Sequence, residues 1–200
     1  MKIIPFQPLH LSKKDAHLLR SAFLAGSVIA FPSDTAYGLA INPQNTTAVR
    51  RIFELKQRML TKEISCIFDS IEQVCLYAVL TKQQKEILQK YLPGLFTFIV
   101  PPTKKYPLAG TVGVRIPKSM YTEKLSQIFG APYTATSANI SGNASLYSAR
   151  DVVAEFEKMP LQPDIVLDVG ALSFGRISTV VDLTGKSPKI IREGSGRFLL

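Results

Sequence analysis

Apolar and polar residues alternate along the chain in blocks whose lengths predict short strands and helices in turn. Apolar runs that end at Pro, Gly or small polar residues predict strands, and apolar residues at a spacing of three and four predict amphipathic helices. The expected strands are residues 3–9, 28–31, 65–68, 96–100, 111–116, 132–135, 165–168, 178–183 and 188–192. The expected helices follow Ser12, begin at Thr46, cover 70–77, follow Thr81, cover 120–129 and follow Ser148.

The order of these elements predicts an α/β fold. Strands and helices alternate irregularly, which favours a mixed sheet over a purely parallel one. The chain contains no repeat, low-complexity tract or linker, so we expect one domain over residues 1–200. Its Gly-rich end, residues 195–200, is expected to be a loose tail.

Three polar stretches lie at the ends of predicted elements: residues 31–39, 56–58 and 136–142. Polar groups at the carboxyl end of a buried strand lie where α/β proteins tend to bind ligands. Taken singly, the second stretch is typical of a solvated helix end, and the third of a loop with Asx and hydroxyl turns. Taken together, they predict one site for an anionic ligand.

The bulk composition is that of a globular protein with a basic surface. Of 200 residues, 46% are hydrophobic and 20% charged, and the net charge is +9. A basic excess either aids solubility or indicates a polyanion, such as nucleic acid or phosphate. The chain has no long run of Lys or Arg, so charge alone favours nucleic acid only weakly.

Several common functional classes are excluded by what the chain lacks. It contains no GxSxG, Walker A or GxGxxG sequence, and no paired carboxylates at a candidate site. His10 and His17 lie apart from every polar stretch, and Cys66 and Cys75 have no metal-ligand spacing, so we expect two buried free thiols and no metal site. No apolar run approaches the ~18 residues that span a bilayer, and there is no signal peptide. We therefore expect a cytoplasmic protein without membrane contact.

Cations and small hydroxyls remain as candidate chemistry. Arg forms bidentate contacts with phosphate and carboxylate, Lys supplies a point charge, and hydroxyls add neutral hydrogen bonds. Arg115 and Arg192 follow apolar strand residues, where a buried Arg has to pair with an anion. The full set is Thr35, Lys56, Arg58, Lys62, Arg115, Ser137, Asn139, Ser141, Ser145, Ser178 and Arg192.

Five motifs in order resemble those of the YrdC-like family of threonylcarbamoyl-AMP synthases, which begin threonylcarbamoyladenosine modification of tRNA. No single motif is specific, but their order and spacing match from about residue 12 to residue 194. The matching segments are 32–39, 56–58, 136–142, 178–183 and 192–194.

The resemblance implies a twisted mixed sheet flanked by helices, with a concave basic ligand cleft. It implies synthesis of threonylcarbamoyl-AMP and pyrophosphate from L-threonine, bicarbonate and ATP, with Mg²⁺ held mostly by ATP itself. Carried over by motif, the catalytic residues are Lys56, Arg58, Ser137 and Asn139. The ATP-binding residues are Arg58, Lys62, Thr111, Ser137, Ser145 and Arg192, and the threonine-binding residues are Thr35, Arg115, Ala135 and Ser178.

Departures from the family pattern leave every cation and hydroxyl in place. Ser33 replaces Thr, Met59 replaces Pro after the Lys-x-Arg motif, and Glu63 replaces Pro after Lys62. The resemblance implies the short bacterial form without an extra C-terminal domain, which passes its product to a separate transferase complex. The alternatives are a YciO-like paralogue, a module that binds tRNA or double-stranded RNA through its basic face, and a hydrolase that handles carbamoyl-phosphate or carbamoyl-AMP.

Overall fold

The structure is a computed structural model that describes residues 1–59, 64–108 and 110–199. Its helices are α1 (Lys13–Leu24), α2 (Thr46–Leu55), α3 (Ile71–Tyr77), α4 (Lys82–Tyr91), α5 (Met120–Phe129) and α6 (Ala149–Phe156). Its strands are β1 (Lys2–Pro5), β2 (Ile29–Pro32), β3 (Tyr37–Ala40), β4 (Ser65–Ile67), β5 (Phe96–Val100), β6 (Val112–Arg115), β7 (Tyr133–Thr134), β8 (Thr136–Ser137), β9 (Ile165–Asp168), β10 (Thr179–Asp182) and β11 (Lys189–Arg192). The mixed α/β class predicted from the sequence is confirmed.

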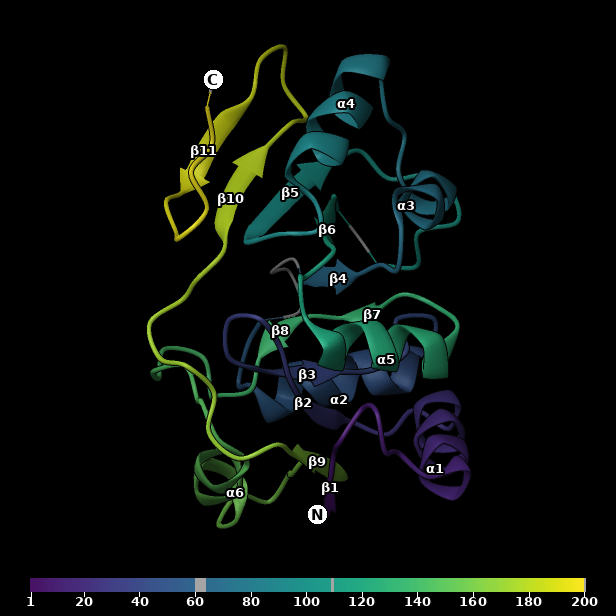
Figure 1. Ribbon diagram of the computed structural model, residues 1–200, viewed down its shortest axis with the longest axis vertical. Coiled ribbons are helices and arrows are strands. Elements are labelled where there is room, and N and C mark those ends of the chain that lie inside the picture. The colour runs from purple at the N-terminus through teal and green to yellow at the C-terminus, as the bar shows by residue number, and fades with distance from the viewer. Residues whose placement is uncertain (60–63, 109, 200) are drawn as a thin grey trace.

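The strands form two mixed sheets, where the sequence predicted a single one. The five-stranded sheet has the order β1-β9-β2-β3-β8, and the six-stranded sheet has the order β11-β10-β5-β6-β4-β7. In Figure 1, β5, β10 and β11 lie in the upper half with α3 and α4, and β1, β2 and β9 lie in the lower half with α1, α2 and α6. The chain passes from one sheet to the other at Ala135, because β7 pairs with β4 while β8 pairs with β3.

The first polar stretch forms a β-hairpin, which the sequence did not predict. Pro32 was expected to stop the strand, but it remains in β2 opposite Tyr37, and β3 continues from Tyr37. Gly38 lies under the ring of Phe31, where an added Cβ would stand 2.9 Å from the ring. Pairing with β2 on one side and β8 on the other stabilises a strand whose Gly and Ala have low β propensity.

Helix caps and packing follow the sequence closely. Ser12 and Thr81 accept hydrogen bonds from the backbone N–H three residues on, and Gly130 ends α5 in the left-handed conformation, with φ 66°. Helices α2 and α6 pack on one face of the five-stranded sheet, α1 and α5 on the other, and α3 and α4 on the six-stranded sheet. Within the described residues, no helix is both long and apolar enough to cross a membrane.

The expectation of two buried thiols is wrong for one of them. Cys66 is buried as expected, but Cys75 is exposed, because α3 buries only one face. The described part of the C-terminal tail, residues 195–199, contacts the rest of the protein: Thr179 Oγ1 donates a hydrogen bond to the carbonyl oxygen of Gly196, and the ring of Phe198 lies 4.9 Å from that of Tyr91. The glycines allow this close packing, since a Cβ on Gly196 would stand 2.7 Å from the carbonyl oxygen of Leu95.

Candidate functional site

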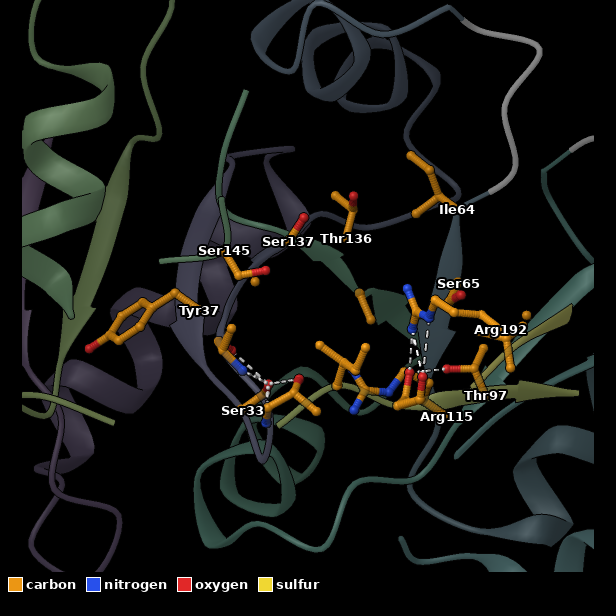
Figure 2. A pocket seen from close by; sticks show the side chains of 18 of the residues that line it. Ser33, Tyr37, Ile64, Ser65, Thr97, Arg115, Thr136, Ser137, Ser145 and Arg192 are labelled. Atoms are coloured by element: carbon orange, nitrogen blue, oxygen red, sulfur yellow. Dashed lines mark hydrogen bonds between the residues drawn. The ribbon is translucent and has the colours of Figure 1, made fainter. Parts of the chain in front are cut away.

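A cavity of about 390 Å³ lies where the two sheets meet. Ser33 and residues 35–38 of the β2–β3 hairpin line one side, and residues of β5, β6 and β10 line the other. Figure 2 shows Ser33 and Tyr37 across the opening from Thr97 and Arg115, with Thr136 and Ser137 between them at the top of the view. The three polar stretches singled out in the sequence therefore meet around one space.

Most of the predicted site residues contribute to the lining of this cavity. They are Thr35, Arg58, Arg115, Ala135, Ser137, Ser145, Ser178 and Arg192. Thr111 is half-buried and is not among the lining residues. Lys62 falls outside the described residues, so its predicted place at the ATP site stays a prediction.

Lys56 and Asn139 lie behind the lining and organise it. Lys56 follows α2 and is 2% exposed, and its ammonium donates to the carbonyl oxygens of Ser137 and Asn139 and to Asn139 Oδ1. The Asn139 amide then accepts a hydrogen bond from the Ser137 hydroxyl and donates one to the Asn143 carbonyl oxygen. The Lys56 ammonium is thus directed at the 137–143 loop, and it holds Ser137 at the cavity wall.

Burial alters the protonation of the two cations of the second polar stretch. Desolvation, helped by the nearby charge of Arg58, lowers the pKa of Lys56 from 10.5 to about 8. Desolvation also lowers the pKa of Arg58 from its ordinary value. Both groups therefore carry their charge at a cost in free energy, which an anionic ligand nearby would offset.

Arg115 has a protein partner, as its buried position at the end of β6 requires. Its Nη2 donates to Asp34 Oδ1 at 2.7 Å, and the two side chains are 10% and 7% exposed. Desolvation raises the pKa of Asp34, and the charge of Arg115 opposes this rise. Among the described residues, Asp34 Oδ2 and Arg115 Nε are buried without a hydrogen-bond partner. The pair connects the turn of the β2–β3 hairpin to the other sheet.

Arg192 is held against the start of β10. Its guanidinium donates to the carbonyl oxygen and the hydroxyl of Ser178, at 2.8 and 2.9 Å, and the Ser178 hydroxyl lies 3.0 Å from that of Thr97. Burial, and then the charge of Arg115, lower the pKa of Arg192. Two arginines thus converge on the same end of the cavity, as Figure 2 shows.

The described lining contains four arginines, Arg58, Arg115, Arg176 and Arg192, and no Asp or Glu. The expected concave basic cleft is therefore present. Hydroxyls supply most of the remaining polar groups, and Ser33 Oγ lies 3.0 Å from Thr35 Oγ1 while it donates to the carbonyl oxygen of Ala36. Such a lining suits phosphate and carboxylate ligands.

The sequence did not point to Asp34 or Arg176 as site residues. Asp34 was hidden because its partner lies 81 residues away along the chain. Arg176 belongs to a loop that carried no pattern of its own, although it lies two residues before Ser178, where the motif at 178–183 begins. Its position next to that motif is the one sequence feature that suggests a role.

The described lining of the cavity contains no Asp, Glu, His or Cys that could hold a metal. Among the described residues, no group of three or more His, Cys, Asp or Glu could bind an ion, and the described lining lacks carboxylates. Mg²⁺ prefers carboxylate and phosphate oxygens. A magnesium ion at this site would therefore depend on the phosphates of a bound nucleotide.

Comparison with known proteins agrees with this geometry. The family Sua5_yciO_yrdC, described as "Telomere recombination", matches residues 21–194. The chain belongs to this family.

Two members named "Threonylcarbamoyl-AMP synthase" are similar to most of the chain. The Pyrococcus abyssi protein is 35% identical over 84% of this chain and 51% of its own length, and the human protein is 32% identical over 80% and 60%. The chain thus spans a little over half the length of these two relatives.

Solved structures of the Sua5_yciO_yrdC family share the fold. The crystal structure of P. abyssi Sua5 complexed with L-threonine has a TM-score of 0.84 and 29% identity, and the match covers 96% of this chain and 57% of that one. The crystal structure of E. coli YciO has a TM-score of 0.88, and the match covers 98% of both chains. At 24% identity, the likeness to YciO shows the fold alone.

Proposed function

We propose that the chain is an L-threonylcarbamoyladenylate synthase, which makes threonylcarbamoyl-AMP and pyrophosphate from L-threonine, bicarbonate and ATP. One observation carries this proposal: the family's motifs enclose a single cavity lined by four arginines, with no carboxylate in its described lining. The synthase names of two relatives and the L-threonine complex of P. abyssi Sua5 support it.

The lining of the cavity suits the two larger substrates. Arg115 would bind the threonine carboxylate, with Thr35, Ala135 and Ser178 around the rest of the amino acid. Arg58, Ser137, Ser145 and Arg192 would contact ATP, and Lys62 and Thr111 stay candidates for the same site. Lys56 and Asn139, which we predicted as catalytic, would act through the loop that they hold, by positioning Ser137.

The reaction would be a nucleotidyl transfer. An oxygen of the carbamate that forms from threonine and bicarbonate would attack the α-phosphorus of ATP, and the bond to the bridging oxygen would break, releasing pyrophosphate. Negative charge grows on the departing pyrophosphate, so fixed cations accelerate this step by electrostatic stabilisation. The protein would supply such cations from Arg58 and its neighbours and would hold both substrates close together. Any Mg²⁺ would be held by the phosphates of ATP.

Product analysis tests the proposal directly. The full chain is incubated with ATP, Mg²⁺, labelled bicarbonate and L-threonine, and pyrophosphate and the labelled adenylate are measured. We expect pyrophosphate release that needs both threonine and bicarbonate. ATP turnover that ignores threonine would contradict the proposal and would favour a hydrolase.

The biological setting follows from the chemistry of the product. A mixed carbonic–phosphoric anhydride hydrolyses readily, so a cytoplasmic transferase complex that modifies tRNA would take it up. Direct contact with tRNA or double-stranded RNA through the basic surface would show as binding that weakens steeply with salt. Binding of that kind in a chain that is inactive with threonine would favour the RNA-binding alternative.

A further inference from the structure

The charge of Arg115 is balanced before any ligand binds. Asp34 Oδ1 accepts a hydrogen bond from Arg115 Nη2 at 2.7 Å, and both side chains are at least nine-tenths buried. Arg115 Nε is buried without an acceptor among the described residues. Arg115 also lines the cavity, where its guanidinium is suited to take an acidic oxygen in addition to Asp34.

The net charge is small at the end of the cavity where Arg115 and Arg192 lie. Arg115 lies close enough to Arg192 for its charge to lower the pKa of Arg192, and Asp34 offsets one of the two positive charges. Ser178 and Thr97, which also line this end, are neutral. A singly charged carboxylate would place one further negative charge beside Asp34, and the ammonium of an amino acid would offset it, whereas a doubly charged anion would place two there.

We propose that Asp34 is a specificity-determining residue, whose charge beside Arg115 admits a singly charged carboxylate to Arg115 and excludes doubly charged phosphate-type anions from it. The inference rests on the proposed function, in which Arg115 binds the carboxylate of threonine. Without such a residue, the phosphates of ATP and free inorganic phosphate would compete for Arg115. Asp34 thereby assigns the carboxylate and the phosphates to different arginines in one basic cavity.

A purely structural role for the Asp34–Arg115 pair is the alternative to be separated. The pair joins the hairpin turn to the six-stranded sheet, so its loss would lower stability whatever its effect on ligands. Stability alone is therefore no test. Competition between a dianion and threonine does test the proposal, because an ion pair with a purely structural role would not change which anion the site prefers.

The experiment measures threonine binding by calorimetry on the full chain, with and without sulfate, which is a dianion at neutral pH. In the wild type, we expect millimolar sulfate to leave the Kd for threonine unchanged. In Asp34→Asn, we expect sulfate to compete with threonine. The inhibition constant of sulfate should be about tenfold lower than in the wild type, because the negative charge of Asp34 next to Arg115 has been removed. Asp34→Glu, which keeps the charge, should behave like the wild type.

Asp164→Asn is a matched control, because it removes the partner of Arg51 from an ion pair of 2.6 Å whose residues do not line the cavity. It should leave sulfate competition unchanged. Competition by sulfate in the wild type would overturn the inference without any variant, as would folded Asp34→Asn in which sulfate still fails to compete. Neither measurement needs turnover, so loss of the synthase activity and loss of this selectivity are separate results.

Discussion

Lys56 donates hydrogen bonds to both the carbonyl oxygen and Oδ1 of Asn139, at 2.8 and 3.3 Å. A third bond goes to the carbonyl oxygen of Ser137, so all three ammonium protons have acceptors on one loop. A residue predicted to bind phosphate therefore serves first to fix the segment that carries Ser137. Its contribution should show in the stability of the protein as well as in its activity.

We expect Lys56→Met to lower the free energy of unfolding. The methionine fits a buried site, but it leaves buried acceptors of the 137–139 segment unsatisfied, which costs about 2 kcal/mol or more. Urea denaturation followed by circular dichroism measures the change. Lys82→Met is the control, because Lys82 is exposed at the start of α4. Equal stability of the two variants would show that the Lys56 hydrogen bonds add nothing to the fold.

The lowered pKa of Lys56 predicts a pH dependence with a definite sign. In the unfolded chain Lys56 binds its proton below about pH 10.5, and in the folded protein below about pH 8. Between these values the unfolded state holds more protons, so the stability contributed by Lys56 rises with pH. We expect the stability of the wild type relative to Lys56→Met to increase from pH 8 to pH 10.5, by at most about 3 kcal/mol. A difference that is flat or falls over this window would contradict the prediction.

Arg58→Ala should abolish turnover while the protein stays folded. Arg58 lines the cavity beside the 136–142 stretch, where charge on the departing pyrophosphate would be stabilised. Loss of one such group typically lowers kcat by about 100-fold or more. Pyrophosphate release measures the effect, and Arg50→Ala, which removes an exposed arginine of α2, is the control. Rates like those of the wild type would remove Arg58 from the site.

The parts of the fold that depend on local sequence could be predicted from it. Ser12, Thr81 and Gly130 mark helix ends because their chemistry acts within a few residues. Strands β3 and β8 were missed, because short segments rich in Gly, Ala and Ser become strands only through their partners. The division into two sheets depends on the same pairings.

The site was predictable in outline because its chemistry lies in the motifs. Arg115 was expected to need an anion, but no pattern identified Asp34 as that partner. Lys56 was expected to be catalytic, yet its acceptors are two backbone carbonyls and the Asn139 amide oxygen, 81 and 83 residues away along the chain, which no local sequence pattern reveals. The sequence does not show which residues far apart along the chain become hydrogen-bond partners, because the packing of the folded protein decides this.

Gly38→Ala should destabilise the hairpin that forms one wall of the cavity. The new methyl group would stand 2.9 Å from the ring of Phe31 and 3.3 Å from the carbonyl oxygen of Thr136, so β3 would shift against β2 or β8. Overpacking of this kind costs about 1–3 kcal/mol. Thermal unfolding measures it, with Gly185→Ala as the control, because the nearest atom there is 3.8 Å away. Equal melting temperatures would mean that the hairpin absorbs the extra group.

Thr179→Val should release the C-terminal segment from the sheet. Thr179 is 2% exposed, and its hydroxyl donates to the carbonyl oxygen of Gly196 and accepts from the N–H of Gly194. Valine has a similar shape but can neither donate nor accept a hydrogen bond. The buried backbone groups of Gly194 and Gly196 therefore lose their partners, which should lower the free energy of unfolding by about 1–3 kcal/mol. Hydrogen exchange should speed up at residues 194–199, next to Arg192 and Ser178. Thr184→Val, at an exposed position after β10, should leave exchange there unchanged. Unaltered protection in Thr179→Val would mean that the packing of Phe198 against Tyr91 suffices to hold the tail.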